Sequence, residues 1–521
     1  MLVHEFLENS AQQFPEKNAV WFNNSWMTYS QINESADHIA NFLIDKGIKR
    51  GDRVIILSDN SFNYVISYYA ILKTGAVTVE LNTENGSDDI KFLVNDCEAK
   101  AIIVQKKYES LLQKIIKDTP SLQIVISDET QTVLDRKDII YYDFQQIYAQ
   151  FGKDFKKPEI KESDIASIIY TSGSTGTPKG VVLSHQNFLV NTRSIVEYLK
   201  LTPEDRIMVI LPFFYVYGKS LLNTHFFTGG SVVIDNRFVF PNAILETMKK
   251  TECTGFAGVP STFSILLNNS AIHKFVFLKL RYLTQAGGAM APVIQKKVAL
   301  AFYPAQLFIM YGATEASARL SYLSPYVLTR KWGSIGKAIP NVELFVADEH
   351  GNPLPPGESG EIVARGLNIM QGYWGDEEET ARVLRNGLYF TGDLGKMDDE
   401  GYIYIVGRKK DMIKVGANRI SPKEIEEKLL ENPQMHEVAV IGVEDEILGE
   451  AIKAFVVLRN SDKNFGHNEI LSYCKKRLPQ FKVPKYIEIV KSLPKNSSGK
   501  IIKHKLIRNS PFRKSENPKL N

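Results

Sequence analysis

The chain has 521 residues, of which 44% are hydrophobic and 23% charged, as is typical of a globular protein with a large core. Its 63 basic and 59 acidic residues leave a formal net charge of +4, which gives no argument for a nucleic-acid partner. The sequence contains no run of about 18 apolar residues that would span a membrane, and it begins without a signal-peptide pattern. Three isolated cysteines, at positions 97, 253 and 474, have no metal-binding spacing and favour a reducing, cytoplasmic location.

Helical and extended patterns alternate in the first third of the chain. Apolar residues recur at helical spacing in two segments, 29–43 and 62–72. Short apolar runs predict buried strands at 54–57, 101–104, 124–126 and 165–170. This alternation predicts an α/β fold whose sheets are largely parallel and covered by helices.

From about residue 341 the pattern changes to short strands between turns rich in glycine and proline. The expected strands are 343–347, 360–364 and 402–406, which predict a small antiparallel β subdomain. After residue 411 a small α+β unit begins, with a helix starting at Pro422 and a capping box formed by Ser421 and Glu424. We therefore expect an N-terminal domain of residues 1–407 and a C-terminal domain of residues 408–521.

The segment Tyr170-Thr-Ser-Gly-Ser-Thr-Gly-Thr-Pro-Lys-Gly180 follows a predicted buried strand and is rich in glycine and hydroxyl side chains. Glycines let the backbone turn tightly around an anion, hydroxyls add hydrogen-bond donors, and a lysine adds positive charge. These features predict a phosphate-binding loop formed by Thr171, Ser172, Gly173, Ser174, Thr175, Gly176, Thr177 and Lys179. The spacing differs from that of a Walker motif, so a P-loop motor or GTPase is disfavoured.

Five motifs in order resemble those of the adenylate-forming superfamily, which includes acyl-CoA synthetases, luciferases and the adenylation domains of peptide synthetases. They are loop 170–180, Tyr311-Gly-Ala-Thr-Glu315, Tyr389-Phe-Thr-Gly-Asp393, Gly401-Tyr-Ile-Tyr-Ile-Val-Gly-Arg-Lys-Lys-Asp411 and Pro494-Lys-Asn-Ser-Ser-Gly-Lys500. The resemblance covers about residues 5–508 and is strongest to an AMP-forming acyl-CoA synthetase. It implies a large N-terminal domain, a small mobile C-terminal domain, and activation of a carboxylic acid by ATP with release of pyrophosphate.

The resemblance also implies a nucleotide site. Tyr311 would lay its ring on the adenine, and the opposite side of the base and the border with the substrate would be lined by Gly287, Gly288, Ala289 and Gly312. Asp393 would accept the ribose hydroxyls, with Arg408 as a second ribose contact. Thr314 would donate to a phosphate, and the hard carboxylate oxygens of Glu315 suit Mg²⁺ on the triphosphate. Arg419 would contact phosphate or help to position the second acceptor.

Two lysines are expected to serve the two half-reactions. Lys500 resembles the lysine that meets the attacking carboxylate and the α-phosphate, and it would act together with Lys179, Thr314 and Glu315. Because two anions must meet in this reaction, catalysis depends mainly on positioning and electrostatic stabilisation. Lys410 matches the hinge about which the small domain rotates between adenylation and thioester formation.

The segment Leu211-Pro-Phe-Phe-Tyr-Val-Tyr-Gly218 resembles the acyl-binding segment, and the expected pocket residues are Phe214, Tyr215, Gly218 and Gly312. Many acyl-CoA synthetases have histidine where this chain has Tyr215. Residues 212–220 include no aspartate to hold an α-ammonium group, which favours an acid without an α-amine. The aromatic residues suggest an apolar acyl or aryl group, and Lys219 is a candidate for meeting a second carboxylate.

The motifs do not separate coenzyme A from the phosphopantetheine arm of a carrier protein as the acceptor, because both present the same thiol. The chain has no appended carrier domain, so a carrier would act in trans. An acyl-CoA synthetase is the leading hypothesis and a stand-alone adenylation enzyme that loads a carrier is the second. A luciferase-like oxygenase and a non-catalytic nucleotide-binding relative are further alternatives. The intact motif residues Lys179, Glu315, Asp393 and Lys500 argue against the last of these.

Overall fold

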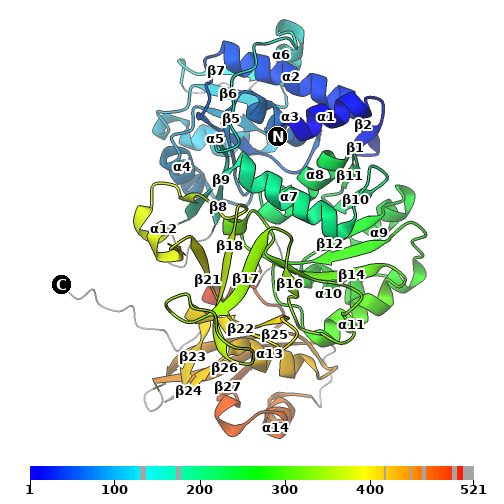
Figure 1. Cartoon of the computed structure of the whole chain (residues 1–521), viewed down its shortest axis with the longest axis vertical. Helices are drawn as coiled ribbons and strands as arrows, with labels where there is room; N and C mark the ends of the chain where they lie inside the picture. Colours follow the sequence, from blue (N-terminus) through cyan, green and yellow to red (C-terminus); the bar gives the residue numbers. More distant parts are fainter. Residues whose placement is uncertain are drawn as a thin grey trace, which may run out of the picture.

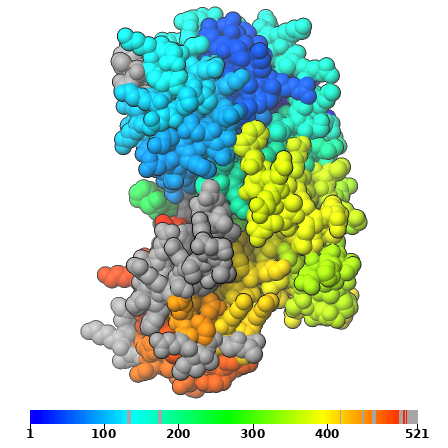
Figure 2. Space-filling model, turned by 90° about the vertical axis from the view of Figure 1, so that its left-hand side faces the viewer, coloured from blue at the N-terminus to red at the C-terminus, as the bar shows by residue number. Residues whose placement is uncertain are grey.

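The computed structural model describes residues 1–129, 136–171, 178–415, 418–445, 449–459, 465–495 and 501–508. The molecule is elongated, with the N-terminal residues at one end and the strands after residue 413 at the other (Figure 1). Figure 2 shows the same order from the side, with the yellow segment around residues 340–410 lying between the blue and orange parts. No helix among the described residues is long and apolar enough to cross a membrane.

The first sheet has eight strands in the order β19-β9-β8-β4-β3-β5-β6-β7. Its central strands pair in parallel, whereas β8, β9 and β19 pair antiparallel at one edge. The bounds are β3 (Arg53–Leu57), β4 (Val77–Glu80), β5 (Ala101–Val104), β6 (Ile124–Ser127), β7 (Ile140–Asp143), β8 (Ile165–Thr171), β9 (Lys179–Ser184) and β19 (Gly372–Tyr373).

The second sheet has nine strands in the order β16-β15-β14-β13-β12-β10-β11-β1-β2, and its centre is again parallel. The bounds are β1 (Asn18–Phe22), β2 (Ser25–Thr28), β10 (Arg206–Val209), β11 (Ser231–Ile234), β12 (Gly255–Gly258), β13 (Tyr282–Gln285), β14 (Gln306–Tyr311), β15 (Ser321–Leu323) and β16 (Lys337–Ala338). These two sheets confirm the expected α/β fold.

Helices cover both sheets and fill the space between them. Helix α7 packs on β9 of the first sheet, α8 packs on β10 and β11 of the second, and the two helices contact each other. The helices of this part are α1 (Glu5–Gln13), α2 (Tyr29–Asp45), α3 (Phe62–Lys73), α4 (Ser87–Asp96), α5 (Glu109–Ile115), α6 (Phe144–Gln150), α7 (His185–Leu199), α8 (Val216–Thr228), α9 (Pro241–Lys250), α10 (Pro260–Asn269) and α11 (Pro292–Ala301).

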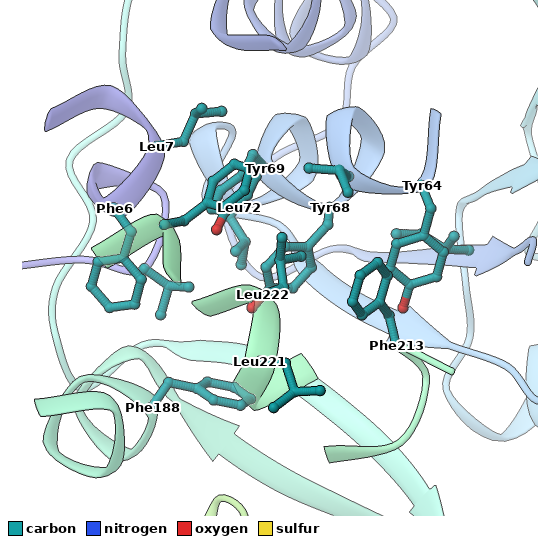
Figure 3. Close-up of a cluster of buried hydrophobic side chains, with 14 of the residues drawn as sticks. Phe6, Leu7, Tyr64, Tyr68, Tyr69, Leu72, Phe188, Phe213, Leu221 and Leu222 are labelled. Atoms are coloured by element: carbon teal, nitrogen blue, oxygen red, sulfur yellow. The ribbon is translucent and has the colours of Figure 1, made fainter. Parts of the chain in front are cut away.

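The core between the two sheets contains several aromatic rings where α3 faces α8 (Figure 3). Tyr69 stacks on Phe226 with the ring centroids 5.2 Å apart, and Tyr64 packs against Phe213 at 5.3 Å. Leu221 and Leu222 of α8 belong to the same cluster, and all of these side chains are buried. Helix α8 is therefore held on several sides, which fixes the position of the segment that leads into it.

The third sheet is the expected antiparallel subdomain. Its strands are β17 (Val342–Ala347), β18 (Ser359–Gly366), β20 (Leu384–Arg385), β21 (Leu388–Met397) and β22 (Ile403–Arg408), and α12 (Glu377–Val383) precedes β20. The fourth sheet contains β23 (Ile413–Val415), β24 (Asn418–Ile420), β25 (Met435–Asp445), β26 (Gly449–Leu458) and β27 (Tyr486–Ile489). Its helices are α13 (Pro422–Leu430), α14 (His467–Arg477) and α15 (Lys503–Arg508).

Helix α13 begins where the sequence predicts, but its cap is only half of a capping box. The Ser421 side chain accepts a hydrogen bond from the backbone N–H of Glu424, at 3.5 Å. The Glu424 carboxylate does not return the bond to Ser421, because both of its oxygens bind Lys482 Nζ at 2.7 Å. An ion pair with a residue distant in the sequence has replaced the local hydrogen bond.

Candidate functional site

The predicted phosphate loop connects two strands rather than a strand and a helix. Residues 172–177 lie outside the described residues, whereas the two ends of the loop are described. Thr171 on β8 pairs with Lys179 on β9 in antiparallel register, and the Thr171 hydroxyl lies 3.5 Å from the Lys179 carbonyl oxygen that accepts its hydrogen bond. The hairpin therefore holds the ends of the loop together at the edge of the first sheet.

Lys179 and Glu315 are brought together by a tyrosine that the sequence did not single out. The Tyr373 hydroxyl on β19 donates to Glu315 Oε1 at 2.9 Å, and Lys179 Nζ lies 5.4 Å from the centre of the same ring. Burial and the Glu315 carboxylate raise the pKa of Tyr373, so its hydroxyl stays protonated and remains a donor. Lys179 also forms an ion pair with Glu379 of α12 at 2.6 Å.

Thr314 and Glu315 follow β14 in a tight turn that requires a glycine. A Cβ atom on Gly312 would lie 2.0 Å from the carbonyl oxygen of Ala318, so no larger residue fits without moving the backbone. The short helix Thr314–Ala316 completes the turn. Residues 287–289 follow the neighbouring parallel strand β13 and are exposed. Both segments therefore lie at the carboxyl ends of parallel strands, where open α/β sheets bind ligands.

Asp393 lies at the centre of a second network, which Tyr311 connects to the same turn. Arg408 on β22 is directly opposite Asp393 on β21, and its Nε donates to Asp393 Oδ1 at 2.8 Å. The Tyr311 hydroxyl donates to Asp393 Oδ2 at 2.7 Å. The Asp393 charge raises the pKa of Arg408, and burial together with this carboxylate raises the pKa of Tyr311. Each carboxylate oxygen retains a second lone pair, so Asp393 has the capacity to accept further hydroxyl donors.

Glu315 is the carboxylate that the sequence analysis assigned to Mg²⁺. Among the described residues no group of three or more His, Cys, Asp or Glu side chains is placed to hold a metal ion. Mg²⁺ at phosphate sites usually takes one or two protein carboxylates and completes its shell with phosphate oxygens and water. The single carboxylate of Glu315, oriented by Tyr373, fits this requirement.

The predicted acyl segment enters α8 through a backbone contact that again requires glycine. A Cβ atom on Gly218 would lie 2.1 Å from the carbonyl oxygen of Pro212. Phe214 is buried, and its ring lies 4.6 Å from that of Tyr215, the residue before the first turn of α8. The carboxylate that Lys219 meets is the protein's own Glu80, at 2.5 Å, and both side chains are at most 1% exposed. This ion pair corrects the expectation that Lys219 is available to a second substrate carboxylate.

The C-terminal candidates lie where the chain leaves the third sheet. Lys410 is exposed in the short helix Lys409–Asp411, which links β22 of the third sheet to β23 of the fourth. Arg419 on β24 is also exposed, opposite Lys414 on β23. Lys500 lies outside the described residues, so its distance from the other candidates is not defined.

Comparison with known proteins gives family matches over most of the chain. The family described as AMP-binding enzyme matches residues 7–374, and the AMP-binding enzyme C-terminal domain matches residues 424–500. A long-chain-fatty-acid–CoA ligase of Bacillus subtilis (strain 168) is 33% identical over 97% of this chain and 94% of its own length.

Solved structures of similar proteins cover nearly the whole chain. The anthranilate CoA ligase AuaEII in complex with anthranoyl-AMP has a TM-score of 0.90 and 26% identity, covering 97% of this chain and 96% of its own. The o-succinylbenzoate coenzyme A synthetase from Bacillus subtilis in complex with ATP and magnesium has a TM-score of 0.82 and 27% identity, covering 96% and 98%.

Proposed function

The chain belongs to the family of AMP-binding enzymes, and we propose that it joins a carboxylic acid to coenzyme A through an acyl-adenylate. ATP activates the acid, pyrophosphate leaves, and the coenzyme A thiol then displaces AMP. The observation that carries this proposal is the turn 311–315, which contacts both polar networks. Tyr311 binds Asp393 at one end of the turn, and Glu315 binds Tyr373 next to Lys179 at the other.

The network around Asp393 binds the ribose of the nucleotide, and the network around Lys179 and Glu315 binds its phosphates. Asp393 accepts the ribose hydroxyls beside Arg408, and the exposed segment 287–289 borders the base. Lys179, Thr314 and the hydroxyls of the 171–177 loop hold the phosphates, and Glu315 supplies the protein ligand for Mg²⁺, which offsets the phosphate charge. Lys500 completes the positive environment in which the acid and the α-phosphate meet.

We place the domain boundary at residues 407 and 408, with Lys410 as the hinge. The linker helix Lys409–Asp411 is exposed and connects the third sheet to the fourth, which supports its role as a hinge. Phe214, Tyr215, Gly218 and Gly312 contact the acyl group, and the lack of an aspartate in residues 212–220 favours an acid without an α-amine. The three cysteines are free and buried, which suits a reducing cytoplasmic environment.

The proposal is tested by exchange of labelled pyrophosphate into ATP with a panel of fatty, aryl and amino acids, followed by transfer to coenzyme A or to a phosphopantetheinylated carrier protein. We expect acid-dependent exchange, AMP as the product and preference for coenzyme A. Asp393→Asn should raise the KM for ATP by about 10- to 100-fold, because it removes a charge-assisted acceptor. The matched control is Glu343→Gln, which alters an exposed carboxylate that pairs with Arg365 at the surface. Formation of ADP, or preference for a carrier protein, would contradict the proposal.

A further inference from the structure

Arg319 is a buried cation without a carboxylate partner. Its side chain is only 2% exposed, and among the described residues no Asp or Glu lies within ion-pair distance of its guanidinium. Its contacts are all neutral: Met310 Sδ lies 3.3 Å from Nε, the Ala318 carbonyl oxygen lies 3.1 Å from Nη1, and Ser220 Oγ lies 3.5 Å from Nη2. The Tyr217 ring stacks against the guanidinium at 4.2 Å, which offsets part of the cost of burying the charge.

Lys219, which is on the same helix as Ser220, differs from Arg319 because it has a carboxylate partner. Lys219 is equally buried, but Glu80 neutralises it at 2.5 Å. A guanidinium is always charged, and its planar fork of donors matches a carboxylate or phosphate in bidentate geometry. A buried charge is normally paired, because removing an unpaired ion from water is costly. Arg319 is therefore oriented for an anion that the described part of the protein does not provide.

The position of Arg319 links the two segments that are proposed to line the acyl group. A Cβ atom on Gly312 would lie 2.8 Å from the Arg319 Cα, so the backbone of Arg319 packs directly against the turn that contains Gly312. Its side chain contacts Tyr217 and Ser220 in the first two turns of α8. The cation thus stands between the end of β14 and the acyl-binding helix.

A small enclosed cavity of about 10 Å³ adjoins the guanidinium, roughly the space that one water molecule needs. Its polar lining consists of Ser220, Thr224, His225, Tyr282, Thr284 and Arg319. Burial lowers the pKa of His225 to about 4, so this ring is neutral, and its two nitrogens are taken up by the Leu221 carbonyl at 2.8 Å and the Tyr282 hydroxyl at 3.1 Å. Arg319 is therefore the one charged group in this lining.

We propose that Arg319 binds an acidic group on the acyl part of the substrate, so that the preferred acid carries a second carboxylate away from the one that reacts with ATP. The inference rests on the proposed function, because it assigns the substrate class of the same site. A purely apolar chain would leave the guanidinium without an anionic partner, whereas a second carboxylate would accept two of its N–H donors.

The test compares kcat/KM in pyrophosphate exchange for acids matched in length, such as octanoate against octanedioate and benzoate against isophthalate. We expect the wild-type enzyme to prefer the diacid of at least one pair by about tenfold or more, as one well-formed charged hydrogen-bonded pair provides. Arg319→Met retains the length of the side chain and should abolish this preference, while Arg319→Lys should retain part of it. Arg365→Met, at an exposed ion pair, is the matched control and should leave the preference unchanged.

The possible results separate the inference from the proposed function. Exchange with monoacids but without any preference for diacids in the wild-type enzyme would overturn the role of Arg319 and leave acid activation intact. Equal losses on monoacids and diacids in Arg319→Met would also overturn it, because the residue would then serve the reacting carboxylate or the fold. Absence of exchange with every acid would overturn the proposed function, and the inference with it.

Discussion

Replacement of Lys219 by methionine should strongly destabilise the larger part of the chain. Lys219 Nζ lies 2.5 Å from Glu80 Oε1, and the side chains are 1% and 0% exposed. Ser167 Oγ is 3.0 Å from Lys219 Nζ and also 3.0 Å from Glu80 Oε2, so one hydroxyl accepts from the cation and donates to the anion. The group joins α8 to β4 and β8, and burial lowers the pKa of Lys219.

The expected loss in the free energy of unfolding arises because Lys219→Met leaves the Glu80 charge buried without its partner. Removing one member of a buried ion pair costs about 3–5 kcal/mol, whereas replacing both members by well-packed neutral groups is often nearly neutral. Lys219→Met should therefore lower the free energy of unfolding by about 3–5 kcal/mol. Adding Glu80→Gln, which can still accept the Ser167 hydrogen bond, should recover most of that loss.

The assay is urea unfolding followed by tryptophan fluorescence. All four tryptophans lie before residue 408, at positions 21, 26, 332 and 374, so the signal reports on the larger part of the chain. The two single variants and the double variant form a double-mutant cycle that isolates the interaction between the two residues. Additive losses, or a loss below about 1 kcal/mol for Lys219→Met, would refute the reasoning.

Three further predictions concern catalysis, pH and packing. Lys500→Ala should slow adenylate formation by at least about 10²-fold and spare transfer from a synthetic acyl-adenylate, whereas Lys410→Pro should mainly slow transfer; single-turnover kinetics of each step would show equal losses if the hinge is wrong. Burial lowers the pKa of His185 from 6.5 to about 3. Between these two pH values the unfolded state therefore binds a proton at His185, whereas the folded state does not. His185 should therefore lower the free energy of unfolding below pH 6.5 by up to about 1.4 kcal/mol per pH unit, and a flat urea-unfolding profile between pH 7 and 5 would contradict this. Gly218→Ala should reduce kcat/KM for the acid through the clash with the backbone at residue 212, whereas Gly152→Ala, with open space around it, should not.

Local patterns were sufficient to locate most of the elements that carry the site. The periodicity in residues 29–43 and 62–72 predicted α2 and α3, and the apolar runs predicted β3, β5, β6 and β8 with ends close to those observed. Such patterns succeed because helices and strands repeat their buried positions at spacings of about 3.6 and 2 residues, which the sequence displays directly. The motif residues Asp393 and Arg408 were likewise identified from the sequence, and the structure places them side by side on β21 and β22.

The tertiary structure alone decided which side chains meet. Tyr373 binds Glu315 across 58 residues of sequence, and Tyr311 binds Asp393 across 82. The local sequence pattern also does not predict the burial of Arg319 or the ion pair between Lys219 and Glu80. The reason is physical: whether a charged side chain is exposed, paired or left without a partner depends on segments that the fold brings together from distant positions. The sequence by itself therefore determined the family and most of the elements, while the packing of α8 determined that Lys219 is paired with Glu80 and that Arg319 contacts only neutral groups.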